Sequence, residues 1–474
     1  MKEFFEKVLE FFTGTLNDVA WLYILLPCVA IGGVFFTIRN RGVQFTRLGA
    51  SLKIAVGKNA RSDKDKKGSV SAFQALTTAL AATVGTGNIV GTCQAIAMGG
   101  YGAIFWLWIA ALLGMVIKYA EVVLAVHYRE RNAKGDWVGG PMYYIVNGMG
   151  KGWKWLAVLF TLFAVLASFG IANFSQINSI TDSVTGAVTA FSPATAANHG
   201  ETIALVVGIL LALITAFALL GGIKRIGKIT ELMIPFMSIL YIVFTLVVIG
   251  KNYANIGGAF SKIFSAAFKP QAIWGAASGI AVKEAIIWGL RRSAFSNEAG
   301  LGSAGIAHAA AETDSAVKQG LYGIFEVFTD TLVICTLTGL TVVVSNVAGM
   351  PGVAPGSSLI TAAFSTVFGN KFAALFVAIS LMFFAYSTVL GWSLYGTRCV
   401  EHLFGMKATK IYQLLFVAGI VLAATSIINF DSAMALSDTF NGLMAIPNFI
   451  ALFALSGVVA KLTKEYFGNK SRLQ

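Results

Sequence analysis

The stretch Thr83-Val84-Gly85-Thr86-Gly87-Asn88-Ile89-Val90-Gly91 decides the fold, because it interrupts an apolar run that extends from Thr77 to Met98. Glycine lowers helix stability by about 1 kcal/mol relative to alanine, so three glycines this close together weaken the helix. In lipid, a backbone group without a hydrogen-bond partner costs several kcal/mol. The stretch is therefore typical of a discontinuous membrane helix whose free carbonyls and amides hold a ligand.

The composition of the whole chain is that of a polytopic membrane protein. Of its 474 residues, 57% are hydrophobic and 12% are charged, whereas soluble domains average about 25% charged residues. The net charge of +13 is better explained by basic cytoplasmic loops than by nucleic acid, so we expect no nucleic-acid partner. The sequence contains no nucleophile elbow, phosphate loop or zinc motif, and we do not expect an enzyme.

Apolar runs of the length that crosses a bilayer recur along the chain. The candidate spans are Trp21–Thr37, Thr77–Met98, Ile104–His127, Trp155–Ile180, Thr202–Ile223, Ile229–Ile249, Lys283–Ala311, Leu321–Val344, Phe372–Gly396, Ile411–Ile428 and Ala433–Ala460. Nine basic and two acidic residues between Arg39 and Lys67 predict a cytoplasmic connection, with the N-terminus outside and the C-terminus inside. Lys251, Lys262 and Lys269 fall on the outer side and do not fit this pattern.

A second glycine-rich break, at 296–305, suggests an internal repeat. Residues 70–250 and 271–460 each hold five candidate spans. Because five is odd, the second set starts from the opposite face, as in an inverted repeat whose first helices are both broken. We expect an all-α membrane protein of 11 transmembrane helices. Residues 1–69 would form an extra helix with its basic connection, and 461–474 a cytoplasmic tail.

The first break could bind a zwitterion and a cation. Unwound carbonyls, such as those of Thr83 and Val84, suit sodium or an ammonium group, and amides at the start of a half-helix, near Gly85, Thr86 and Gly87, suit a carboxylate. Asn88 adds a side-chain oxygen. The alternative is that Gly87 and Gly91 only permit close helix packing, but packing does not explain Asn88 or the second break.

Two other spans carry polar residues that could contribute to the same site. Asn173 and Gln176 are three residues apart, so we expect them to share a helix face, although hydrogen bonding between helices is an open alternative. The hydroxyls of Ser387 and Thr388 could bind sodium, and Trp392, four residues after Thr388, could wall a pocket. Bonds from these hydroxyls to their own helix remain the alternative.

Charged residues inside the spans also need partners. Lys118 and Glu121 are three apart and could pair, and Glu326 and Asp330 lie four apart. Others flank the second break: Arg291, Arg292 and Glu298. We expect structural pairing or gating, because no chain of carboxylates runs through the spans.

Three motifs carry a family resemblance: Thr83–Gly91, Gly139–Tyr144 and Phe295–Ala304. They are similar to the alanine or glycine:cation symporter family, and the similarity covers nearly the whole chain. The family belongs to the amino acid–polyamine–organocation superfamily and has the leucine-transporter fold. The resemblance implies sodium-coupled uptake of alanine or glycine, with D-alanine as a further candidate, by a monomer in a prokaryotic plasma membrane. A proton-coupled permease of the same fold is the alternative.

The resemblance also implies roles for individual residues. Amides near Thr86 and Gly87 would receive the substrate carboxylate, and the Thr83 carbonyl would receive the amine. Sodium would bind the carbonyls of Ala81 and Val84 and the hydroxyls of Ser387 and Thr388. Asn88 lies where related transporters hold a second sodium ion, so it is a candidate for that cation or for substrate. The expected pocket is completed by Asn173, Gln176, Phe295, Asn297 and Trp392.

Overall fold

The computed structural model describes residues 7, 10–57, 70–269, 282–425 and 430–468. Within these ranges the chain is helical except for turns and two pairs of two-residue strands. β1 (Val70–Ser71) runs parallel to β4 (Ala311–Glu312), and β2 (Glu130–Arg131) pairs antiparallel with β3 (Trp137–Val138). The basic connection expected at 58–69 and the tail residues 469–474 lie outside the described residues.

Within the described ranges, every predicted span falls largely on helical segments. The uninterrupted or gently bent ones are η1–α2–η2–α3 (Phe11–Thr15, Leu16–Asp18, Val19–Leu25, Leu26–Arg39), α8 (Gly102–His127), α10–η7–α11 (Lys154–Ser168, Phe169–Ser175, Gln176–Phe191), α12 (Pro193–Leu220), α13 (Gly222–Lys251), α17–η9–α18 (Ala316–Val327, Phe328–Cys335, Thr336–Val344) and α20 (Asn370–Phe404). These seven are long and apolar enough to cross a membrane, and a bent pair, α22 (Phe430–Ala454) with α23 (Ser456–Gly468), makes eight within the described ranges. α21 (Ala408–Ala423) is shorter.

The two predicted broken helices are both interrupted where the glycines lie. The first comprises α6 (Ala72–Thr83), η4 (Gly87–Gly91) and α7 (Thr92–Gly99), and the second α15 (Val282–Asn297) and α16 (Ala304–Ala309). Each piece is too short to pass alone as a span. The described residues therefore yield fewer long helices than the number of spans predicted.

Two further helices lie between the predicted spans. α14 (Ile256–Phe268) and α19 (Ser357–Phe368) have 13 and 12 residues, respectively, too few to cross a bilayer. The other short elements are α4 (Val43–Thr46), α5 (Leu48–Val56), α9 (Pro141–Tyr144), η5 (Ile145–Met149), η6 (Lys151–Trp153) and η8 (Tyr253–Asn255). A search for membrane-length apolar runs misses helices of this size.

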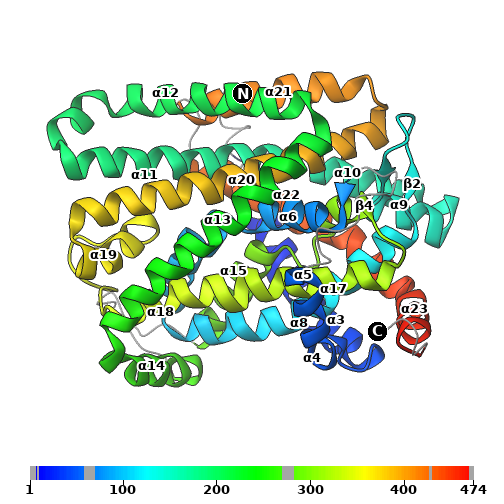
Figure 1. Ribbon diagram of the computed structural model, residues 1–474, viewed down its shortest axis with the longest axis horizontal. Coiled ribbons are helices and arrows are strands. Elements are labelled where there is room, and N and C mark those ends of the chain that lie inside the picture. Colours follow the sequence, from blue (N-terminus) through cyan, green and yellow to red (C-terminus); the bar gives the residue numbers. More distant parts are fainter. Residues whose placement is uncertain (1–6, 8–9, 58–69, 270–281, 426–429, 469–474) are drawn as a thin grey trace.

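The broken helices lie in the middle of the bundle (Figure 1). α6 packs against α13 and α20, and α15 packs against α8. By contrast, α12 and α13 carry large apolar side chains that remain exposed, including Leu213, Phe217, Leu232 and Ile239. Exposed apolar side chains outside a buried polar centre are what a lipid environment requires.

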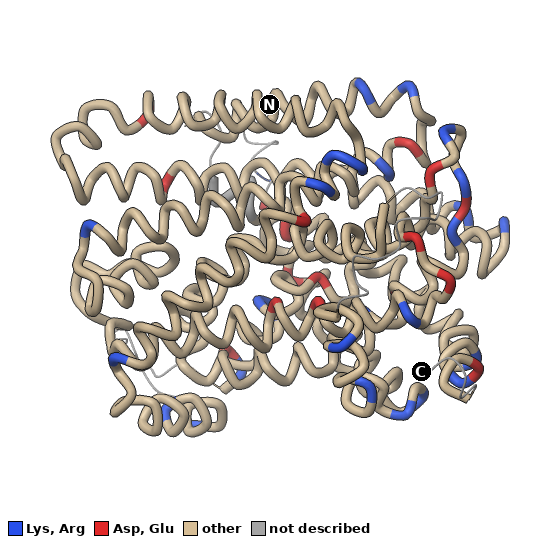
Figure 2. Tube along the Cα trace, viewed as in Figure 1, with Lys and Arg blue, Asp and Glu red and all other residues tan. Residues whose placement is uncertain are grey.

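Basic residues gather at the end of the bundle where α8 and α20 finish, on the right in Figure 2. There Arg129 donates hydrogen bonds to the carbonyls of Ala309, Ala311 and Thr313, just after α16. Burial, with a smaller contribution from the positive charge of Arg131, lowers the pKa of Arg129 to about 10, so the side chain stays cationic at neutral pH. This contact ties the end of α8 to the end of the second broken helix.

Candidate functional site

The first break is shaped by its own asparagine. In a continuous helix the Gly85 N–H would bond to the Ala81 carbonyl. Instead it donates to Asn88 Oδ1 at 2.8 Å, and Val84 has an extended backbone, with ψ of 91°. The carbonyl of Ala81 therefore loses its helical donor at the C-terminal end of α6, where the helix dipole concentrates negative charge. Such an end suits a cation.

Two predicted cation ligands meet at this point. Ser387 Oγ, on α20, lies 3.2 Å from the Val84 carbonyl oxygen and also donates to Phe384 O at 2.8 Å. Thr388 Oγ1 would lie 2.2 Å from a Cβ added to Gly85, so only glycine permits this approach of the break to α20. Backbone and hydroxyl oxygens from two helices thus converge. In the described residues, no group of three His, Cys, Asp or Glu side chains could hold a metal ion.

Gln176 brings a third helix to the break. Its Oε1 accepts a hydrogen bond from the Thr86 N–H at 3.3 Å and would lie 3.3 Å from a Cβ on Gly85. Gly87 faces the second broken helix, since an added Cβ would contact Ser296 at 3.3 Å and the Phe295 ring at 3.4 Å. The predicted substrate residues Gly85, Thr86, Gly87, Gln176 and Phe295 therefore lie together at the first break. Thr83, one turn below, uses its hydroxyl on its own helix.

Asn173 does not join this group. Its amide donates to Phe416 O of α21 at 3.1 Å, whereas Gln176 faces α6, so the prediction that the two share a helix face is wrong. The reason is η7, a π-helical turn that ends at Ser175. Its wider spacing rotates residues three apart away from each other.

A buried carboxylate joins the two breaks. Asp330, on η9, accepts from Asn88 Nδ2 at 2.7 Å and from Ser296 Oγ at 2.9 Å. Thr331 Oγ1 also donates to it, at 2.7 Å. Asp330 is fully buried, and two donors from the broken helices and one from its own neighbour on η9 satisfy it. In the sequence, Asp330 is recognisable only as a charge in a span.

The predicted substrate residues Asn297, at the end of α15, and Trp392, on α20, have protein partners around the second break. Asn297 Oδ1 accepts from the Ala299 N–H at 2.9 Å, and its Nδ2 donates to Ser293 and Thr331, both at 3.1 Å. Trp392 Nε1 donates to Glu298 Oε1 at 2.6 Å. Both side chains therefore help to hold the second break.

The pairing predicted between Lys118 and Glu121 is wrong. Lys118 Nζ lies 3.3 Å from Glu326 Oε1 on α17, and His308 Nε2 lies 3.1 Å from the other oxygen of Glu326. Glu121 instead accepts the backbone N–H groups of Gly300 and Gly302, each at 3.0 Å. These partners are far away in sequence, so helix spacing could not reveal them.

The neighbouring residues Arg291 and Arg292 have different surroundings. Arg291 donates to Asp438 at 3.2 Å and to Asn17 at 2.8 Å. Arg292 is buried, with its guanidinium 5.5 Å from the centre of the Phe295 ring. Arg291 thus ties the second broken helix to α2 and α22, while Arg292 lies beside the predicted pocket.

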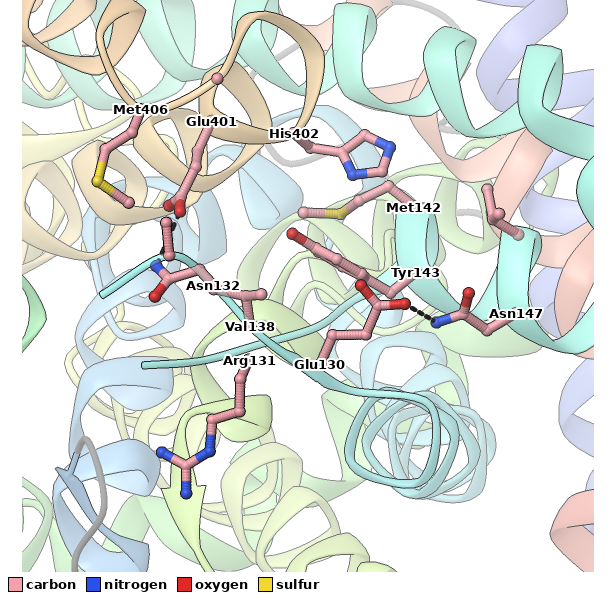
Figure 3. Close-up of a pocket in the computed structure, with 13 residues that line it drawn as sticks. Glu130, Arg131, Asn132, Val138, Met142, Tyr143, Asn147, Glu401, His402 and Met406 are labelled. Carbon is pink, nitrogen blue, oxygen red and sulfur yellow. Dashed lines mark hydrogen bonds between the residues drawn. The ribbon is translucent and has the colours of Figure 1, made fainter. Parts of the chain in front are cut away.

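A separate cavity of about 360 Å³ lies at the basic end of the bundle, between the β2–β3 hairpin, α9 and the end of α20 (Figure 3). Hydrogen bonds from Asn132 to Glu401 and from Asn147 to Glu130, both 2.8 Å, border it. None of the predicted site residues lines this cavity. It is distinct from the convergence at the first break.

Two broken helices that meet at the centre of a polytopic membrane bundle define the class of secondary transporters. The chain matches the profile of the sodium:alanine symporter family over residues 6–474, and it belongs to that family. It is therefore a membrane-embedded sodium:amino acid symporter and not an enzyme.

Individual relatives agree with this assignment. The chain is 44% identical over 458 residues, 96% of each chain, to the sodium/alanine symporter AgcS of Methanococcus maripaludis. It is 36% identical over 467 residues to a probable sodium/glutamine symporter, GlnT, of Bacillus subtilis, covering 98% of this chain and 92% of that one. The solved structure of MhsT in complex with L-phenylalanine covers 84% of this chain and 99% of MhsT, with a TM-score of 0.57 at 16% identity. That likeness shows the fold.

Proposed function

We propose that this protein imports a small neutral amino acid, alanine or glycine, together with sodium by alternating access. The observation that carries the proposal is the approach of Ser387 Oγ to the Val84 carbonyl, 3.2 Å, where α6 ends. Oxygen ligands from the break and from α20 would close around one sodium ion. Ala81 and Val84 would supply backbone carbonyl oxygens. Ser387 and Thr388 would supply hydroxyl oxygens, after these side chains rotate away from the carbonyl of their own helix that they now contact.

The substrate carboxylate would take the amides of Thr86 and Gly87. The Thr86 N–H now donates to the neutral oxygen of Gln176 at 3.3 Å. A carboxylate forms hydrogen bonds about twice as strong as a neutral acceptor does, so it would displace Gln176. The amine would face the Thr83 carbonyl, and Phe295 and Trp392 would limit the side chain to a small one.

A second cation is proposed at Asn88. Ser296 Oγ and the Asp330 carboxylate bring side-chain oxygens together beside the Asn88 amide, and Asp330 carries a full negative charge when ionised. The same observation favours the alternative function, proton coupling, because a buried carboxylate can take a proton instead of a metal ion. The two alternatives differ in which gradient drives uptake.

The architecture that we propose is an 11-helix membrane protein whose residues 70–250 and 271–460 form an inverted repeat. Both repeats begin with a helix broken at its glycines, and residues 11–39 form the extra helix. The N-terminus would lie outside, because the basic end of the bundle in Figure 2 would face the cytoplasm of a monomer in the plasma membrane.

Uptake of labelled alanine into proteoliposomes, with sodium and pH gradients imposed separately, tests the function. We expect accumulation with an inward sodium gradient at equal pH, and none with a proton gradient alone. Accumulation driven by protons without sodium would establish the alternative, and no accumulation of alanine or glycine in either case would refute the proposal.

A further inference from the structure

Protein groups occupy the backbone donors of the second break. The N–H of Ala299 donates to Asn297 Oδ1 at 2.9 Å, and the N–H of Leu301 donates to the Glu298 carbonyl at 3.2 Å. The two glycine amides between and after them, at Gly300 and Gly302, converge on Glu121 Oε1, each at 3.0 Å. Four consecutive amides thus have acceptors within the chain.

Glu121 is held in place for this task. It projects from α8 and is fully buried. A third donor, Asn448 Nδ2 on α22, reaches the same Oε1 at 2.6 Å and also donates to the Gly300 carbonyl at 2.8 Å. The hydroxyl of Tyr144 donates in turn to Asn448 Oδ1. A carboxylate oxygen with three N–H donors is a strongly bound acceptor.

The backbone of the second break depends on these bonds. Gly300 and Gly302 have φ angles of +93° and +80°, and Glu298 has +55°, so three residues here have left-handed backbone. Cβ atoms at the two glycines would lie 2.7 Å from Phe449 and 2.5 Å from Pro141. Without an acceptor for its amides, a chain in this conformation would have buried, unpaired donors.

The first break differs in the chemistry of its acceptors. Its amides at Gly85 and Thr86 donate to the neutral amide oxygens of Asn88 and Gln176, the latter at a long 3.3 Å. A ligand carboxylate can replace a neutral oxygen at 3.3 Å, but it gains nothing over a carboxylate that is already in place.

We propose that Glu121 is a resident carboxylate that occupies the amides of the second break. It holds that break in its bent shape and restricts carboxylate ligands to the first break. Glu121 is a positioning residue, because it acts through Gly300 and Gly302 rather than on substrate. The transport consequence rests on the proposed function, whereas the effect on the shape of the break does not.

The surroundings of the other carboxylate oxygen of Glu121, Oε2, determine which substitution can test the proposal. Oε2 has no hydrogen-bond partner within the described residues, and Lys118 is paired with Glu326 instead. The amide-accepting role therefore lies in Oε1 alone, and the carbonyl oxygen of a glutamine can perform it. A role in carrying a proton or a net charge would be lost in the same substitution.

The experiment compares E121A and E121Q in alanine uptake and in the thermal unfolding of purified, substrate-free protein. E121A removes four heavy atoms, the number in acetate, so added acetate fits the space and supplies the missing acceptor. We expect uptake by E121A to fall about tenfold and its Tm to drop, because two buried amides lose their acceptor. Acetate should restore both, propionate less, and E121Q should keep most of the Tm, because its carbonyl oxygen still accepts the two amides.

E465A is the matched control, since Glu465 is an exposed carboxylate on α23, 4.0 Å from Lys461. Its uptake and Tm should equal those of the wild type, and acetate should change neither. The proposal is overturned if E121A behaves as wild type, or if E121Q is as inactive as E121A and acetate restores nothing. If E121A does not fold, E121Q decides alone. If the wild type takes up no alanine, the proposed function is refuted. The effect of acetate on the Tm of E121A would still test the role of Glu121.

Discussion

Asn88 Nδ2 lies 2.7 Å from Asp330 Oδ1, and Asn88 Oδ1 accepts the Gly85 N–H at 2.8 Å. One side chain therefore ends the first half-helix and fastens it to η9. Because Asp330 also accepts from Ser296 at 2.9 Å, the two breaks share a single buried carboxylate. A change at either break would be transmitted through it.

Replacing Asn88 with alanine should abolish alanine uptake and lower the unfolding free energy by about 2 kcal/mol, because it leaves both the Gly85 N–H and Asp330 short of a partner. The thermal unfolding of detergent-purified protein measures the second effect. N178A is the control, since among the described residues the Asn178 amide donates only to Phe174 O, four residues earlier, at 2.8 Å. Equal effects of the two substitutions would show that the hydrogen bonds of Asn88 to Gly85 and Asp330 do not stabilise the first break.

The breaks themselves could be predicted from sequence because glycine and small polar residues stand out locally in an apolar run. The partners of the buried charges could not. Glu121 and Gly300 are 179 residues apart, and nothing local distinguishes a carboxylate that caps a distant loop from one that pairs with Lys118. The face of Asn173 was misjudged for another reason: a π-helical turn leaves no clear mark in sequence.

Gly85→Ala should stop transport, because its Cβ would lie 2.2 Å from Thr388 Oγ1 and would push α20 away from the cation site. Uptake in proteoliposomes, at matched protein content, measures this loss. G186A is the control: a Cβ at Gly186 meets nothing within 4 Å, so that variant should transport normally. Normal transport by G85A would show that α20 does not need to approach the break this closely.

Trp392→Phe keeps an aromatic ring but removes the donor to Glu298, which now lies at 2.6 Å. If the ring face walls the pocket, W392F should transport more slowly yet remain selective for small amino acids, whereas W392A should also accept larger ones. Competition of alanine uptake by leucine and phenylalanine measures selectivity. A W392A protein that is still not inhibited by bulky amino acids would limit Trp392 to its support of Glu298.

Ser387→Ala and Thr388→Ala should each raise the sodium concentration for half-maximal uptake, by about tenfold for the loss of one ligand. The amino acid preference should not change. S393A serves as the control on the same helix, because Ser393 Oγ bonds to Leu390 O of α20 at 2.7 Å. If sodium activation is identical in all three variants, the hydroxyls of Ser387 and Thr388 are not sodium ligands.

Joint binding of sodium and the amino acid at the first break underlies the proposed transport. Its most direct test is equilibrium binding of labelled alanine to purified protein in sodium chloride and in choline chloride, with wild type and the S387A/T388A double variant. The account predicts that sodium tightens alanine binding about tenfold or more in the wild type and has little effect in the double variant. Equal alanine affinity in sodium and choline, or full sodium dependence in the double variant, would contradict it.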